Sequence, residues 1–188
     1  MEGVRLMEGK TAFKALAAIR IVLGWGFLYA GLSKFLMIGS GEPFSAAGFL
    51  RFGTAGTWPG VAETAEGATP LVHNPTQQLW IDLAANPTLL ALVDTLVVFG
   101  QVSIGMALIL GLATRFAGVM GFTMMTLLTI AAWDFGHGIV NQTSLYAVVA
   151  LAVGLAHAGK AYGLDGLLER ATFVRERVAL RSVGAVVA

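Results

Sequence analysis

The sequence predicts an all-α membrane protein, a polytopic four-helix bundle whose long outer loop carries short helices. Hydrophobic residues make up 56% of its 188 residues and charged residues only 12%, about half the charged fraction of a soluble domain. Four apolar stretches, at about residues 13–37, 89–112, 116–133 and 139–157, are each close to the roughly 20 residues that a helix needs to cross a bilayer. Because spans and loops use nearly all of the chain, we expect residues 1–188 to form a single domain.

The positive charges predict how these spans are oriented. An even number of spans allows both termini to face the cytoplasm, and only Lys34 and Arg51 of the 12 Lys and Arg residues then lie outside. Cytoplasmic loops are normally the ones enriched in Lys and Arg. The chain is therefore predicted to be a multi-pass protein of the cell membrane, with an outer loop at about residues 39–88 and a cytoplasmic tail at about 161–188.

Two short helices are expected in the outer loop. Asn74-Pro75 before residues 76–85 is typical of a capped helix with proline at its first position, and Asn86-Pro87 would end this helix. Apolar residues between 44 and 52 predict a second short element that lies in the membrane interface. In the tail, apolar residues at helical spacing from 167 to 178 predict an amphipathic helix.

Several chemistries are excluded by what the sequence lacks. Cysteine is absent, which excludes disulfides, thiolate metal sites, cysteine-ligated iron–sulfur clusters and c-type haem attachment. The net charge of +1 gives no nucleic-acid footprint. Paired histidine ligands for haem are not expected either, since His137 and His157 would lie at opposite ends of one helix. No metal site is predicted.

Polar groups from all four spans are predicted to lie at one level, near the outer ends. A charge within a span is costly and by default suggests a functional site. Lys34 is near the outer end of the first span, and Asp94 is about 9 Å inside the second at 1.5 Å per residue. His137 joins the last two spans, and Asn141 begins the fourth. Together they predict a shared pocket in which Lys34 or His137 binds an anion or a carbonyl, and Asp94 or His137 moves protons.

Each of these polar residues also has a structural interpretation. Asp94 would form a buried pair with Lys34, and His137 would mark a helix end at the headgroups. Gln101 shares a face with Asp94 near mid-membrane, where an amide is more typical of a hydrogen bond between helices. Arg20, about two turns inside the first span, is expected to extend to the inner surface, with a buried role as the alternative.

Aromatic and methionine side chains near these polar groups would line a site for a flat ring, or would simply pack against helices and lipid. On the first two spans they are Trp25, Phe99 and Met106. On the third span they are Met120, Phe122, Met124 and Met125, with Trp133 at its outer end.

Three segments resemble the DoxD/DoxX family of four-helix membrane proteins. They are residues 20–35 (RIVLGWGFLYAGLSKF), residues 100–115 (GQVSIGMALILGLATR), and Asn141 together with residues 162–165 (YGLD). The long outer loop makes the chain more similar to DoxD, the membrane subunit of thiosulfate:quinone oxidoreductase. That resemblance implies oxidation of thiosulfate to tetrathionate, quinone as the electron acceptor, and a companion subunit, DoxA. The chain departs from the family at Gln101, where glutamate is common; if that carboxylate carries protons in the family, proton handling in this chain must differ.

The leading hypothesis is therefore a quinone-interacting oxidoreductase subunit, with the ring between the outer halves of the helices. Whether the chain is an enzyme by itself is left open. Lys34 and His137 would supply positive charge and Asp94 would handle protons, which makes these three the predicted catalytic residues. The predicted quinone- or substrate-binding residues are Trp25, Gln101, Trp133 and Asn141.

Two hypotheses from other classes stay open at this point. One is a non-enzymatic membrane scaffold that recruits a redox partner through its outer loop. The other is a small-solute or lipid transporter, which the lack of discontinuous spans and inverted halves disfavours. Expected partners are membrane lipid, a DoxA-like subunit and further copies of the same chain in a homo-oligomer, but no nucleic acid.

Overall fold

The computed structural model contains only helices and their connections in the residues that it describes, which are 2–39, 44–52, 74–132, 140–160 and 162–171. Three helices are long and apolar enough to cross a membrane, within Thr11–Leu36, Pro87–Leu110 and Thr114–Ala131. The elements are α1 (Glu2–Gly39), α2 (Ala47–Phe52), α3 (Gln77–Ala85), α4 (Pro87–Leu110), α5 (Thr114–Ala131), α6 (Gln142–Leu155), the short 3-10 helix η2 (Ala158–Lys160) and a helix over residues 164–171. The prediction of an all-α membrane helix bundle is confirmed.

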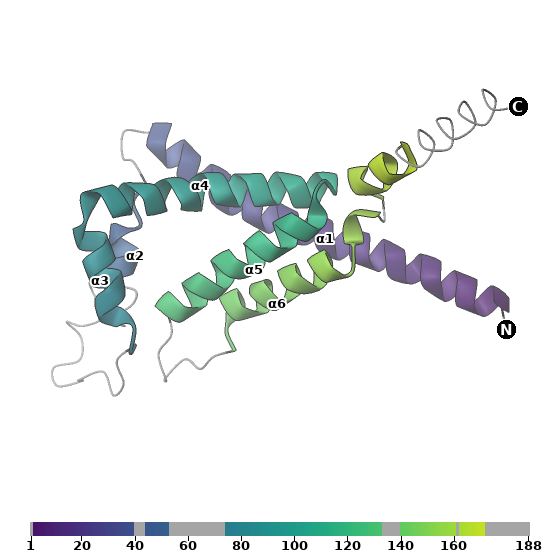
Figure 1. The fold of residues 1–188 in the computed structure, drawn as a ribbon, viewed down its shortest axis with the longest axis horizontal. Helices are drawn as coiled ribbons and strands as arrows, with labels where there is room; N and C mark the ends of the chain where they lie inside the picture. Colours follow the sequence, from purple (N-terminus) through teal and green to yellow (C-terminus); the bar gives the residue numbers. More distant parts are fainter. Residues whose placement is uncertain (1, 40–43, 53–73, 133–139, 161, 172–188) are drawn as a thin grey trace, which may run out of the picture.

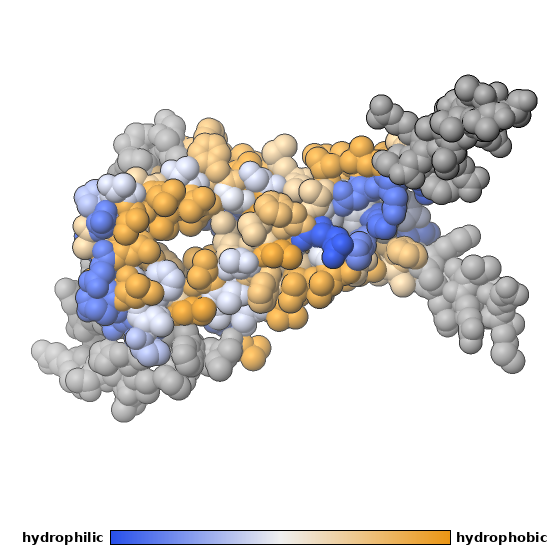
Figure 2. Space-filling view, in the orientation of Figure 1, coloured by the Kyte–Doolittle hydropathy of each residue, from blue (hydrophilic) through white to orange (hydrophobic). Residues whose placement is uncertain are grey.

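The long helices pack as two close pairs. α1 lies along α4, and α5 lies along α6, whereas α4 and α5 touch each other much less. Figure 1 shows the two pairs meeting where α4 leads into α5 and diverging toward the other end, across which α2 and α3 lie. The space-filling view in Figure 2 shows an opening through the molecule between the diverging helices. We refer to the two ends as the Arg20 end and the α2–α3 end.

Glycines make each close pair possible. A Cβ atom at Gly105 of α4 would lie 2.5 Å from the backbone nitrogen of Leu28 of α1. A Cβ atom at Gly118 of α5 would lie 2.7 Å from the carbonyl oxygen of Ala150 of α6. Real side chains do not come this close, so the helix backbones pack directly on each other, as small residues permit in membrane bundles.

Two apolar clusters stabilise the two parts of the fold. The main core lies inside the bundle and includes the buried residues Leu23, Phe27, Ile104, Leu108 and Val153. The second cluster holds α2 against α3 and the start of α4, and it includes Ala46, Leu50, Ala84, Trp80 and Val93.

Arg20 is buried, and the prediction that it extends to the inner surface was wrong. Only 1% of the residue is exposed. Its Nη1 donates to the carbonyl oxygen of Ala158 at 2.9 Å, and Nη2 donates to that of Tyr162 at 3.3 Å. The carboxylate of Asp165 also attracts it electrostatically. The chain after α6 folds back over α1, so partners inside the protein replace the water that an extended side chain would have reached.

Asp165 fixes the turn between α4 and α5 at the same time. Its carboxylate accepts hydrogen bonds from the amides of Ala113 (2.7 Å) and Thr114 (2.9 Å), and its own amide donates to the carbonyl of Gly111 (2.8 Å). Gly111 ends α4 in the left-handed conformation, with φ 66°, which glycine adopts without strain. We call this group the Arg20–Asp165 cluster; its members are Arg20, Gly111, Thr114, Ala158 and Asp165.

Both short helices predicted in the outer loop are present, although α3 begins a little later than expected. Asn74 does not cap it. The Asn74 side chain instead donates to the carbonyls of Ile130 (2.9 Å) and Ala131 (2.8 Å) at the end of α5, and so ties α3 to that helix. Asn86 follows α3 and caps α4 through the amides of Thr88 and Leu89, with proline at the first position of α4.

The fourth apolar helix is shorter than predicted. α6 runs for 14 residues, whereas a span over 139–157 was expected; residues 133–139 lie outside the described part. Asn141 begins the helix because its side chain accepts a hydrogen bond from the Ser144 amide, and the Ser144 hydroxyl in turn accepts from the Asn141 amide. The α-helical conformation ends before His157, whose φ is +51°.

Arg20→Met tests the Arg20–Asp165 cluster. Methionine keeps the length and apolar body of the side chain but leaves Asp165 without its positive partner. The variant also loses the two hydrogen bonds that the buried guanidinium donates to carbonyl oxygens, and hydrogen bonds of charged groups are worth about 1.5–3 kcal/mol each, so we expect a clearly lower unfolding temperature in detergent. Arg115→Met, at an exposed position of α5, is the control and should change stability by about 0.5 kcal/mol or less. An Arg20→Met protein that unfolds at the wild-type temperature would contradict this role.

Candidate functional site

A cavity of about 330 Å³ lies between α1, α4, α5 and α6, within the size range of small-molecule sites. Phe27, Met125 and Leu128 supply apolar walls. Four polar side chains, Gln101, Gln142, Thr143 and Tyr146, also line it. Residues of α1, α4, α5 and α6 thus surround one cavity, but Lys34, Asp94 and Asn141, which were expected in a shared pocket, are not among those that line it.

Lys34 and Gln101 are brought together next to this cavity. The Lys34 ammonium donates to Gln101 Oε1 at 3.0 Å and to the carbonyl oxygen of Ala30 at 3.0 Å, and it lies 5.5 Å from the centre of the Phe44 ring. Gln101 is 5% exposed. Because an ammonium group can only donate, it fixes the amide oxygen of Gln101 toward Lys34 and leaves the amide NH₂ for another acceptor.

Two further side chains of the cavity have hydrogen-bonding groups to offer. Within the described part of the chain, no hydrogen bond engages the Gln142 amide or the Tyr146 hydroxyl. The Thr143 hydroxyl, in contrast, already has two hydrogen-bond partners, Asn141 Oδ1 and Thr129 Oγ1, both at 2.8 Å. The cavity therefore combines apolar walls with three available groups, on Gln101, Gln142 and Tyr146.

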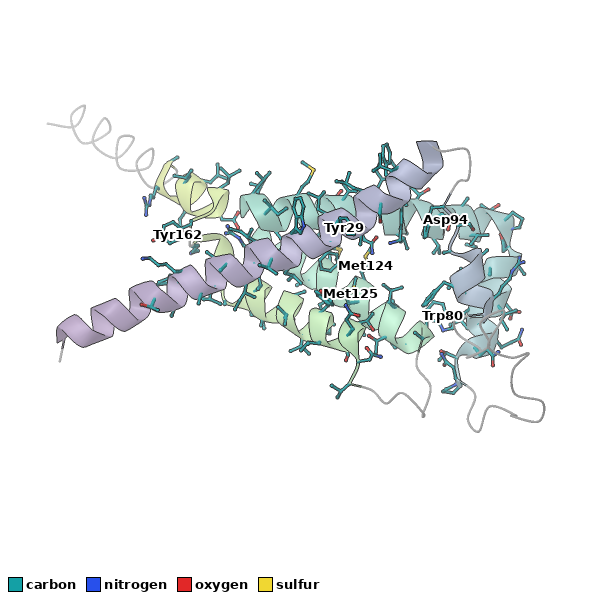
Figure 3. All side chains as sticks on the ribbon, turned by 180° about the vertical axis from the view of Figure 1, so that it is seen from behind. Tyr29, Trp80, Asp94, Met124, Met125 and Tyr162 are labelled. Carbon is teal, nitrogen blue, oxygen red and sulfur yellow. The ribbon has the colours of Figure 1, made fainter. Side chains whose placement is uncertain are left out.

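Asp94 does not form the buried pair with Lys34 that was one of its predicted roles. Its Oδ1 accepts a hydrogen bond from the amide of Ala46 at 2.6 Å, directly before α2. No ion pair joins Asp94 to Lys34, although both residues are described. Asp94 thus anchors the start of α2 on α4. Figure 3 shows Asp94 and Trp80 across the opening from Met124 and Met125 of α5.

The other predicted site residues are placed differently from the expectation. Asn141 caps α6 and does not line the cavity, although its neighbours Gln142 and Thr143 do. Trp25 is 62% exposed and does not line the cavity either. Trp133 and His137 lie outside the described residues. In the described ranges, no cluster of three or more His, Cys, Asp and Glu side chains forms a metal site.

Sequence reasoning missed Tyr146 and gave no role to Thr143 or Gln142 beyond the start of the span. A signal for them was present, because Tyr146 follows Gln142 by four residues and Thr143 by three, which places all three on one face of a helix. That face is marked by polar side chains on an otherwise apolar helix.

In a comparison with known protein families, a family model described as "TQO small subunit DoxD" matches residues 69–183, which is more than half of the chain. The match covers α3 to α6, and with them Gln101, Tyr146 and Asp165, but not α1. No curated protein and no solved structure matches the chain.

Asp94→Ala should loosen α2. The substitution removes the acceptor of the Ala46 amide, and a hydrogen bond to a charged group is worth about 1.5–3 kcal/mol. We expect amide hydrogens over residues 44–52 to exchange with deuterium at least tenfold faster, measured by mass spectrometry. Asp94→Asn keeps an acceptor oxygen and should retain most of the protection, and α6 serves as the internal reference. Unchanged exchange over residues 44–52 in Asp94→Ala would show that Asp94 does not hold α2.

Proposed function

This chain belongs to the DoxD family, and from that premise we propose that it is the membrane subunit of a thiosulfate:quinone oxidoreductase-like enzyme. Quinone would bind in the cavity between α1, α4, α5 and α6. The α2–α3 end would face outward, as the distribution of Lys and Arg predicts, and a sulfur oxyanion would arrive from that side.

The observation that carries this proposal is the chemistry of the cavity. A quinone is a flat apolar ring whose two carbonyl oxygens only accept hydrogen bonds. The cavity offers apolar walls and available donors on Gln101, Gln142 and Tyr146. A few polar groups placed in a mostly apolar pocket are typical of small-molecule sites.

Lys34 would act as a positioning residue for this ring. Its hydrogen bond holds the Gln101 oxygen, so the NH₂ of Gln101 is already turned toward an acceptor before the ligand binds. Such preorganisation reduces the cost of binding. It also gives a role to the amide at the position where the family commonly has glutamate: Gln101 donates, whereas an ionised glutamate would only accept.

The overall reaction balances as follows. Two thiosulfate ions join through a new sulfur–sulfur bond to give tetrathionate and release two electrons. One quinone takes up those two electrons and two protons and becomes quinol. The Lys34 ammonium group carries exchangeable protons and is hydrogen-bonded to Gln101, which lines the cavity. Asp94 would relay protons at the α2–α3 end, His137 would supply positive charge or a proton, and a DoxA-like companion subunit would complete the site for thiosulfate.

Gly26 provides a way to close the cavity without disturbing the helix pairs. A Cβ atom at this position would meet only Tyr146, at 3.8 Å, which is ordinary contact. Gly26→Ala should therefore leave thiosulfate-dependent reduction of a quinone analogue within about twofold of wild type. Gly26→Leu fills the cavity and should lower that rate at least tenfold, with little change in unfolding temperature. The assay uses the membrane protein purified together with its companion subunits.

The same assay can overturn the proposal. If the assembly reduces no quinone and retains none on purification, the scaffold hypothesis is favoured instead. If Gly26→Leu reduces quinone as fast as Gly26→Ala, the quinone does not bind in this cavity.

Lys34→Met separates a positioning role from a structural one. The variant loses the hydrogen bond that orients Gln101, so we expect the KM for quinone to rise about tenfold, which corresponds to about 1.4 kcal/mol. The unfolding temperature should stay close to that of wild type, since Lys34 is only half-buried. Lys34→Arg keeps a donor and should recover most of the affinity. A Lys34→Met protein with an unchanged KM would contradict the positioning role.

A further inference from the structure

A second hollow adjoins the cavity. It is a groove of about 420 Å³ between α1 and α6, and every side chain that lines it is apolar except Tyr146. Its walls include Ala18, Val22 and Leu23 of α1, and Leu145 and Val149 of α6. Tyr146 lines both the groove and the cavity.

The positions of the lining residues show how the two hollows follow one another. On α1, the groove residues 18–23 precede the cavity residues 26–30. On α6, the groove residues 145–149 extend beyond the cavity residues 142–146. α1 and α6 run in opposite directions (Figure 1), so both offsets lead toward the Arg20 end. At 1.5 Å of helix per residue, the lining residues of the two hollows are offset by about 11 Å along α1 and by about 5 Å along α6.

The two adjoining hollows differ sharply in polarity. The cavity holds the donors of Gln101 and Gln142, whereas the groove offers no polar side chain beyond the shared Tyr146. A molecule that matches both hollows has a polar head at the α2–α3 end and an apolar chain directed toward the Arg20 end. The groove volume is about that of one turn of α-helix, which is roughly 10 Å wide and 5.4 Å long. It therefore suits a flexible chain and not the packing of a whole partner helix.

We infer that the groove between α1 and α6 binds the hydrocarbon tail of a prenylated quinone whose ring occupies the cavity. This inference rests on the proposed function and adds the subsite that recognises the tail. Tyr146 lies at the junction, where its hydroxyl is available to the ring and its aromatic body to the first part of the tail. Apolar contact in the groove would raise the affinity of long-tailed quinones above that of the ring alone.

Two neighbouring valines of α6 give a matched test. Val149 lines the groove, whereas Val148 is 63% exposed and does not. Val149→Trp should weaken binding of a prenylated quinone about tenfold and leave the affinity for a tailless benzoquinone within twofold. Val148→Trp should change neither. Affinities are measured by direct titration of the purified protein at fixed detergent concentration, and quinone retained on purification is quantified in parallel.

A second substitution, in the α1 wall of the groove, tests whether Val149→Trp acts by filling the groove or by displacing Tyr146. Ala18→Phe fills the groove from α1, away from the cavity, and should cause the same selective loss. If neither variant weakens the long-tailed ligand, or if both weaken the two ligands equally, the groove does not recognise the tail. A phospholipid that stays in the groove when prenylated quinone binds would also overturn the inference. If wild-type protein binds neither quinone, the proposed function itself fails.

Discussion

The burial of Arg20 is the constraint on which the arrangement of the helices depends. A guanidinium group removed from water must be surrounded by acceptors and negative charge. Its acceptors come from the segment after α6, and the negative charge comes from Asp165, which also holds the first amides of α5. Partners so far apart in the sequence can meet only if both helix pairs converge at this end. At the other end α4 and α5 diverge, and in the part of the chain that the structure describes the α2–α3 segment spans the gap, tied to α5 through Asn74.

The cavity is a consequence of this unequal closure. Where glycines bring helix backbones into contact, as at Gly105 and Gly118, no room is left for a ligand. Where the pairs separate, larger side chains and polar groups surround an open volume. The hydrogen bond between Lys34 and Gln101 joins α1 to α4 beside this volume. Tight packing and an accessible site thus coexist within one small bundle because the close contacts lie within each helix pair, whereas the cavity lies between the pairs.

Features encoded locally could be predicted from the sequence, and features that depend on helix rotation could not. The long apolar runs and the Asn-Pro pairs at 74–75 and 86–87 located the spans and α3, since both signals involve neighbouring residues. The contact between Lys34 and Gln101 requires two helices to face each other, which depth along a span does not determine. Arg20 and Ala158 are 138 positions apart, so nothing near Arg20 indicated its burial. Tyr146 was missed although it shares a helix face with Gln142 and Thr143, because such a pattern does not show that the face borders a cavity.

The length of α6 has a consequence for the surrounding lipid. A helix of 14 residues measures about 21 Å, whereas the hydrocarbon core of a typical bilayer is about 30 Å thick. A membrane adapts to a short apolar segment by thinning beside it. The acyl chains next to α6 would then be compressed and disordered relative to those around α1 and α4. Hydrophobic mismatch would thus give the two sides of the protein different lipid environments, and bilayer thickness would become a variable that affects its behaviour.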